Sequence, residues 1–214
     1  MPSRQSKYIE GHMKTKLLTL AAAMFITFSA SAVDIIELDT PSLDNTVQKV
    51  YSVYCPFCYK YEKAVTPNLI KNLPSGTTFQ AICLENKGAL GVESCEVLAA
   101  AQVLSHKKYK AAKLAMYAAV HDQKLKNVKG SGAIKGDLAA IGMKAAGMSQ
   151  AEFKKALHTD KAQDKLAYDR TIALTIAKKK GIPAIVVNGN KMIDTKTVGS
   201  LKALDSAIEQ YLGE

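Results

Sequence analysis

The chain has 214 residues, of which 48% are hydrophobic and 22% are charged, and its formal net charge is +10. This is the composition of a globular protein with room for one substantial core, and it excludes a low-complexity or repetitive chain. The lysines are scattered among alanines rather than gathered in one block. That arrangement favours solvated helix faces over a nucleic-acid-binding surface and leaves acidic partners as the alternative.

The first 32 residues are predicted to lie outside the folded protein. From Met13 a short basic stretch is followed by an apolar run over 17–28 and by small residues up to Ala32. This pattern is typical of a secretory signal peptide over 13–32, and the run is too short to span a bilayer comfortably. Residues 1–12 are interpreted as an added leader or an over-called start codon. Removing 1–32 takes away a net charge of +3 and leaves +7, with all four cysteines retained.

Two strands are predicted next, over 33–38 and 47–54, with a turn around Pro41 between them. In the second strand neither set of alternating residues is polar throughout. This indicates a central strand that is covered on both faces.

Cys55-Pro56-Phe57-Cys58 follows the second strand and opens a helix predicted over 56–73, with a kink or break at Pro67. The junction places the Cys55 sulfur at the first helical turn, where unpaired N–H groups and the helix dipole stabilise a thiolate. Pro56 suits that turn because its missing N–H costs nothing there. Two cysteines at this spacing serve a metal or a redox disulfide, and the strand-to-helix context favours the redox disulfide.

The rest of the chain reads as a third strand, a helical stretch and a return to strands. No strand is predicted between 88 and 159, and Ser149 with Glu152 forms a capping box at the start of one helix there. Asn188-Gly189 is a strong hairpin signal. The expected strands are 77–84, 184–187 and 191–193, and the expected helices are 93–104, 106–123, 134–146, 150–158, 160–180 and 200–212. The order indicates an α/β domain interrupted in its middle.

These residues resemble the DsbA family of bacterial periplasmic thiol:disulfide oxidoreductases, which have the thioredoxin fold. The resemblance is carried by 47–58, by Gly181-Ile182-Pro183-Ala184, by Val187-Asn188-Gly189 and by the helical insertion. Cys-Pro-Phe-Cys in a basic chain is similar to the DsbL branch. The resemblance implies a thioredoxin-like domain over 33–87 and 160–214, with a helical insertion over 88–159.

The resemblance also implies the roles of the site residues. Cys55 would be the nucleophile, and Cys58 would be more buried and would release stalled mixed disulfides. Pro56 and Phe57 lie between them, and Ile182 and Pro183 would face them through a cis peptide bond, with the Ile182 backbone free to pair with a client chain. Without the resemblance, Pro183 would be interpreted as a residue of a sheet edge or a turn.

Two positions depart from the family pattern. Phe57 stands where DsbA-type sites often have a histidine that stabilises the thiolate. Lys49 stands where relatives often carry a buried acidic group. A strand lysine is more often a structural side chain that reaches the surface, but beneath the cysteines its charge would stabilise a thiolate, so Lys49→Glu is expected to raise the pKa of Cys55.

Cys83 and Cys95 are expected to form a structural disulfide between the third strand and the insertion. The alternatives are two buried free thiols or a four-cysteine zinc site, for which a second close pair is lacking. No metal or other cofactor is expected. His106, His121 and His158 lie on lysine-rich helices and are interpreted as surface residues.

The predicted function is a soluble periplasmic dithiol oxidase that donates its Cys55–Cys58 disulfide to reduced exported proteins, acidic ones among them. A DsbB-like, quinone-linked partner in the inner membrane would recharge it, and a monomer that binds no nucleic acid is expected. The alternatives are an isomerase or reductant on the same scaffold, or a redox-inactive chaperone module. An isomerase of this kind usually carries a dimerisation domain, and the intact cysteine pair argues against a redox-inactive module.

Overall fold

A computed structural model describes residues 33–123 and 137–214. The predicted leader (1–12), the predicted signal peptide (13–32) and the start of the helix expected over 134–146 lie outside the described residues. Within them, no helix is both long and apolar enough to cross a membrane. The strands are β1 (Ile35–Glu37), β2 (Thr46–Tyr51), β3 (Thr78–Cys83), β4 (Ala184–Val187) and β5 (Lys191–Ile193). The helices are α1 (Pro56–Ala64), α2 (Thr66–Asn72), α3 (Gly91–Leu104), α4 (His106–His121), α5 (Asp137–Ala145), α6 (Gln150–Leu157), α7 (Asp160–Lys180) and α8 (Leu201–Leu212).

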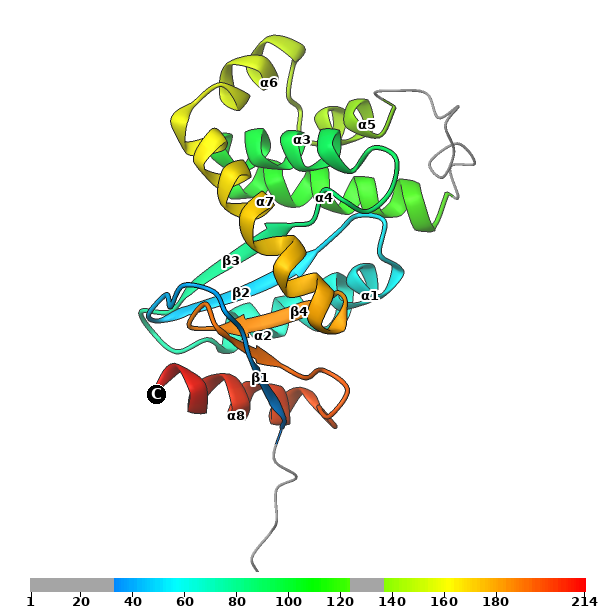
Figure 1. Ribbon diagram of the computed structural model, residues 1–214. Helices are drawn as coiled ribbons and strands as arrows, with labels where there is room; N and C mark the ends of the chain where they lie inside the picture. Colours follow the sequence, from blue (N-terminus) through cyan, green and yellow to red (C-terminus); the bar gives the residue numbers. More distant parts are fainter. Residues whose placement is uncertain (1–32, 124–136) are drawn as a thin grey trace, which may run out of the picture. The chain divides into compact units, whose positions relative to one another are not determined.

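The five strands form one mixed sheet in the order β1-β5-β4-β2-β3 (Figure 1). β2 pairs in parallel with β3, and the other neighbours are antiparallel. Asn188 and Gly189 both have positive φ, which matches the tight turn expected between β4 and β5. Strands distant in sequence therefore meet in the centre of the sheet, where β2 leads directly to the cysteine pair.

Both faces of the sheet are covered, as the mixed polarity of the second strand predicts. On one face Val50 packs in a cluster with Ile172 and Ile176 of α7, the helix that crosses the strands in Figure 1. On the other face Val47 packs with Leu69 of α2 and with residues of α8. Every residue of β2 is buried. The strand that carries the cysteine pair thus lies in the interior, which holds its end in a fixed position.

Helices α3 to α6 lie between β3 and α7 in the chain and form a further apolar cluster with Tyr51 and Cys58. The capping box at Ser149 and Glu152 is confirmed, with both reciprocal hydrogen bonds present. We retain 33–87 with 160–214 and 88–159 as proposed domain limits, since all five strands fall in the first set and α3 to α6 fall in the second.

Two elements near the cysteines differ from their predicted bounds. The second strand ends at Tyr51 rather than Tyr54, because the chain turns and the N–H of Cys55 donates to the carbonyl of Ser52 at 3.0 Å. The helix expected over 56–73 is divided at Val65 into α1 and α2, two residues before Pro67. The break is what a proline in the helix interior predicts.

Candidate functional site

Cys55 is the N-cap residue of α1. Its backbone is extended, with φ −97° and ψ 113°, and its Sγ accepts a hydrogen bond from the N–H of Cys58 at 3.2 Å. A cap residue normally satisfies one of the free N–H groups of the first turn with a side-chain oxygen. Here a sulfur does so, and the same N–H groups favour its thiolate form.

The two thiols have opposite acidities. The pKa of Cys55 is lowered from about 9 to about 6, first by the hydrogen bond from the Cys58 side chain and then by backbone N–H groups and the charge of Lys87, against the effect of burial. Burial raises the pKa of Cys58, and so do the hydrogen bond and the negative charge of Cys55. The pair therefore holds one thiolate and one thiol near neutral pH.

The loop before β4 forms the opposite wall of the site. The Ile182–Pro183 peptide bond is cis, and the Ile182 carbonyl oxygen lies 3.5 Å from the Cys55 Sγ, from which it accepts a hydrogen bond when Cys55 is protonated. Cys55, Phe57, Lys87 and Ile182 help to line an open groove of about 610 Å³. The side chain of Phe57 is 63% exposed there, so it presents an apolar surface directly beside the sulfur.

Lys49 is neither a surface-reaching side chain nor an unpaired charge. It is 1% exposed, and its Nζ lies 2.7 Å from the Glu62 Oε2 and 2.7 Å from the Thr66 Oγ1. Its charge lowers the pKa of Cys58, whereas Lys87 is the lysine that lowers the pKa of Cys55. The expectation that it reaches the surface is therefore wrong, and the effect of Lys49→Glu on Cys55 stays a prediction.

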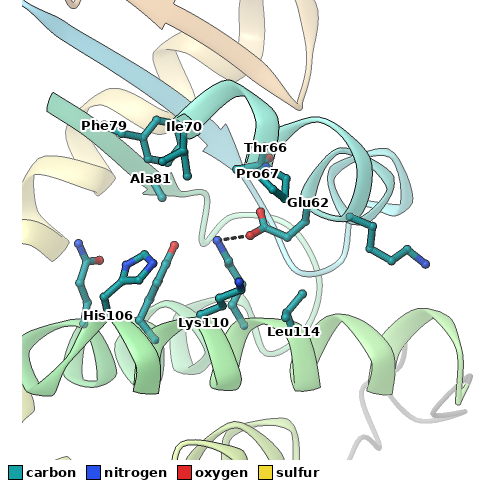
Figure 2. Close-up of a pocket in the computed structure, with 13 residues that line it drawn as sticks. Glu62, Thr66, Pro67, Ile70, Phe79, Ala81, His106, Lys110 and Leu114 are labelled. Atoms are coloured by element: carbon teal, nitrogen blue, oxygen red, sulfur yellow. Dashed lines mark ion pairs between the residues drawn. The ribbon is translucent and has the colours of Figure 1, made fainter. Parts of the chain in front are cut away.

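Glu62 also forms an ion pair with a second buried lysine. The Lys113 Nζ of α4 lies 2.6 Å from the Glu62 Oε1, the ion pair drawn in Figure 2. Burial raises the pKa of Glu62, but Lys113 and Lys49 outweigh it and hold that pKa below its ordinary value. Burial lowers the pKa of Lys113 to about 8. One carboxylate thus pairs with two buried ammonium groups, one helical turn beyond Cys58. The sequence analysis missed this feature because Lys113 is far away along the chain.

His121 is a second residue that the sequence analysis placed wrongly. It is half-buried, its Nε2 lies 2.9 Å from the carbonyl oxygen of Val53, and its ring stacks on Tyr59 with centroids 5.6 Å apart. Tyr59 in turn stacks on Tyr117 at 5.2 Å. This aromatic group packs beside the segment that leads into the cysteine pair. The sequence analysis interpreted His121 as a surface residue because it lies at the end of a lysine-rich helix.

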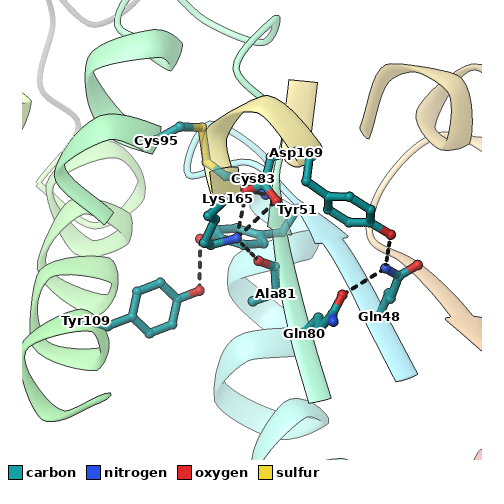
Figure 3. A network of polar contacts seen from close by, with 10 residues as sticks. Gln48, Tyr51, Gln80, Ala81, Cys83, Cys95, Tyr109, Lys165 and Asp169 are labelled. Carbon is teal, nitrogen blue, oxygen red and sulfur yellow. Dashed lines mark hydrogen bonds and ion pairs between the residues drawn. A yellow bond between two sulfur atoms is a disulfide. The ribbon is translucent and has the colours of Figure 1, made fainter. Parts of the chain in front are cut away.

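Cys83 and Cys95 are joined by a disulfide with an S–S distance of 2.01 Å and Cα atoms 5.7 Å apart (Figure 3). It links the end of β3 to α3. The N–H of Cys83 donates to the Asp169 Oδ2 at 2.9 Å, and Lys165 pairs with the same carboxylate. In this form neither sulfur is available as a thiolate ligand, which removes the four-cysteine zinc alternative.

Replacing both Cys83 and Cys95 by alanine should lower the free energy of unfolding by about 3 kcal/mol, because the unfolded chain loses a short closed loop. Urea unfolding of the double variant beside the unaltered protein, both with the active-site pair oxidised, measures this. Disulfide exchange at Cys55 should persist. An unchanged unfolding midpoint would show that the link contributes nothing to stability.

Comparison with known proteins gives consistent matches. A family model described as thioredoxin matches residues 40–209. The thiol:disulfide interchange protein DsbL of Escherichia coli is 37% identical over 91% of this chain and 94% of its own length. DsbA of Salmonella typhimurium is 29% identical over 92% and 94%. The crystal structure of DsbL from Salmonella enterica serovar Typhimurium superposes with a TM-score of 0.78 and 35% identity over 85% of this chain and 96% of that one.

Proposed function

Because this chain belongs to the thioredoxin-fold family of the thiol:disulfide interchange proteins DsbL and DsbA, we propose that Cys55 and Cys58 are its redox pair. The protein is a disulfide oxidoreductase. The observation that carries the residue assignment is the opposed acidity of the two sulfurs at one helix start. That polarity suits an oxidant, which has to favour its own reduced form.

In the proposed cycle a client thiolate attacks the Sγ of Cys55. The Cys55–Cys58 bond breaks, a client–Cys55 bond forms, and Cys58 leaves with the electron pair and takes up a proton. The second client thiolate then attacks the client sulfur and expels Cys55 as a thiolate. Two electrons pass from client to enzyme, and the low pKa of Cys55 makes it a good leaving group. The exchange balances with the two cysteines alone, so the proposal needs no cofactor.

The groove is proposed to hold an extended client segment. Phe57 offers an exposed apolar contact, and Ile182 lies just before β4 with its carbonyl already directed at Cys55. A chain laid along this loop would place its own backbone groups beside Ile182, as in strand addition. Pro183 follows Ile182 through the cis peptide bond and lies directly before β4.

The reduced protein should be more stable than the oxidised protein by a margin that grows as the pH rises. The Cys55 pKa is lowered on folding from about 9 to about 6. Its thiolate therefore adds nothing to the free energy of unfolding of the reduced protein below about pH 6. It adds about 1 kcal/mol at pH 7, after allowance for solvent screening, and its full contribution above about pH 9. Urea unfolding of both redox forms across this range measures the margin.

The same measurement separates the alternatives. An isomerase or reductant on this scaffold would show equal stability of the two forms, or greater stability when oxidised. A redox-inactive chaperone module has no need of a destabilising disulfide, so its reduced form would likewise show no extra stability. Either result would overturn the oxidant assignment.

Acidic clients are proposed from the charge of the site. The net charge of 33–214 is +7, and Lys87 lies in the groove beside Cys55. Lys87→Glu should raise the pKa of Cys55 and slow disulfide transfer to an acidic peptide more than to a neutral one. Thiolate absorbance and transfer rates measure the two effects. The control is Lys202→Glu, which makes the same change of charge at an exposed position of α8. An equal effect of both variants would contradict a role for Lys87 itself.

We further propose a periplasmic location and a DsbB-like, quinone-linked membrane partner. Each transfer leaves the pair reduced, so turnover requires an oxidant. The Cys83–Cys95 disulfide fits an oxidising compartment. Cell fractionation and the redox state of Cys55 in cells lacking the membrane oxidant test both statements, and a monomer is expected in light scattering.

A further inference from the structure

A second cavity, of about 340 Å³, lies apart from the catalytic groove and shares no lining residue with it. Figure 2 shows it between α1 and α2 on one side and α4 on the other, with Phe79 and Ala81 of β3 at its floor. Its volume falls within the range of small-molecule sites. The disulfide exchange described above does not use it.

The charges around this cavity are unbalanced. Glu62 is the carboxylate of the lining, and it is already shared by Lys49 and Lys113. These three side chains are 8%, 1% and 6% exposed, so they form a buried cluster of one anion and two cations, of which Glu62 and Lys113 line the cavity. Lys63 and Lys110 also line the cavity and are exposed, and the Lys63 Nζ lies over the ring of Tyr59, 3.9 Å from its centroid. An anion inside the cavity would compensate the excess positive charge where solvent screens it least.

The rest of the lining combines an apolar wall with the polar residues Thr66, Gln102, His106 and Tyr109. Pro67, Ile70, Phe79 and Leu114 provide the apolar surface, and the side chain of Ile70 is 41% exposed at the rim. Gln102 also lines the cavity, and its Oε1 is buried without a hydrogen-bond partner among the described residues. This oxygen is an acceptor and a carboxylate has no hydrogen to donate, so Gln102 indicates room for a donor such as water and does not itself select an anion.

We propose that this cavity binds a small amphipathic carboxylate, with its charged end near Lys110 and Lys113 and its aromatic or alkyl body against Ile70, Phe79 and Leu114. The lysines supply charge-assisted hydrogen bonds to the carboxylate. The apolar wall excludes a strongly hydrated ion such as free phosphate. The site is independent of the redox pair, so its occupation does not depend on the proposed oxidant function.

Titration of the purified protein with phenylbutyrate, followed by methyl NMR and calorimetry, tests the proposal. The Ile70 and Leu114 methyl signals should shift with one-to-one stoichiometry. Phenylbutyramide, which has the same body without the charge, should bind about tenfold more weakly or worse because the charged hydrogen bonds are lost. Equal binding of acid and amide would overturn the assignment of an anion site.

Two exposed rim positions allow variants that spare the core. Lys110→Glu and Ile70→Glu should each weaken phenylbutyrate binding by about tenfold or more through like-charge repulsion. Lys107→Glu lies on the same helix outside the cavity and should leave binding unchanged. If Lys107→Glu weakens binding as much as Lys110→Glu, or if the shifted methyl signals belong to Leu84 and Ile182 of the catalytic groove, the proposal is wrong. Disulfide transfer by all three variants should stay normal.

Discussion

Replacing Cys55 by alanine should reduce disulfide transfer to the uncatalysed rate, whereas replacing Cys58 by alanine should trap mixed disulfides with clients. Cys55 is the N-cap sulfur with the lowered pKa and the neighbour of Ile182 in the groove. Cys58 is fully buried, so its thiolate attacks the Cys55 Sγ of a mixed disulfide, which re-forms the Cys55–Cys58 bond and expels the client thiolate. Without Cys58 a client bonded to Cys55 has no internal thiol to release it.

Non-reducing electrophoresis and mass spectrometry of the two variants with a reduced or oxidised client peptide measure this difference. The double variant of Cys83 and Cys95 is the matched control, because it also removes two sulfurs but leaves the redox pair intact. Mixed disulfides formed through Cys58 in the Cys55→Ala variant would reverse the assigned roles.

Replacing Glu62 by leucine should lower the free energy of unfolding by about 3–5 kcal/mol, because it leaves two buried ammonium groups without their carboxylate. The loss should shrink as the pH rises, since a buried lysine without a partner escapes the cost by losing its proton. Burial already lowers the pKa of Lys113 to about 8. Urea unfolding of the oxidised protein at about pH 6 and about pH 9 measures both effects.

The control for Glu62→Leu is a triple variant in which Lys49 and Lys113 also become methionine. Apolar replacement of a whole buried ion cluster is often neutral or stabilising. The triple variant should therefore regain most of the lost stability. A triple variant as unstable as Glu62→Leu alone would show that packing, rather than unpaired charge, causes the loss.

The local parts of the fold were predictable from the sequence. The helix start at Cys55, the capping box at Ser149, the hairpin at Asn188-Gly189 and the end of α7 before Gly181 each depend on a few adjacent residues. The family and the thioredoxin fold are confirmed by the comparisons. Each of these signals comes from spacing or backbone preference, which a single sequence displays directly.

The surroundings of the redox pair were less predictable. Glu62 and Lys113 are 51 positions apart, and nothing in their local sequence indicates that they meet inside the protein. His121 lies 66 positions from Cys55 and reaches Val53 only because α4 packs against that segment. The absence of a histidine at Phe57 suggested that Lys49 supports the thiolate, which stays a prediction; its pairing with Glu62 and the effect of Lys87 on the pKa of Cys55 were not visible in the sequence.

The Cys83–Cys95 disulfide between β3 and α3 determines how many electrons one molecule exchanges with its clients. Cys83 and Cys95 line neither the catalytic groove nor the second cavity, and the N–H of Cys83 already donates to the carboxylate of Asp169, so the bond offers no groove to an incoming thiolate. With Cys55 and Cys58 as the proposed redox pair, a protein with four cysteines would therefore behave as a two-electron reagent. Each client receives one disulfide per encounter, and the second pair holds the molecule together without being consumed.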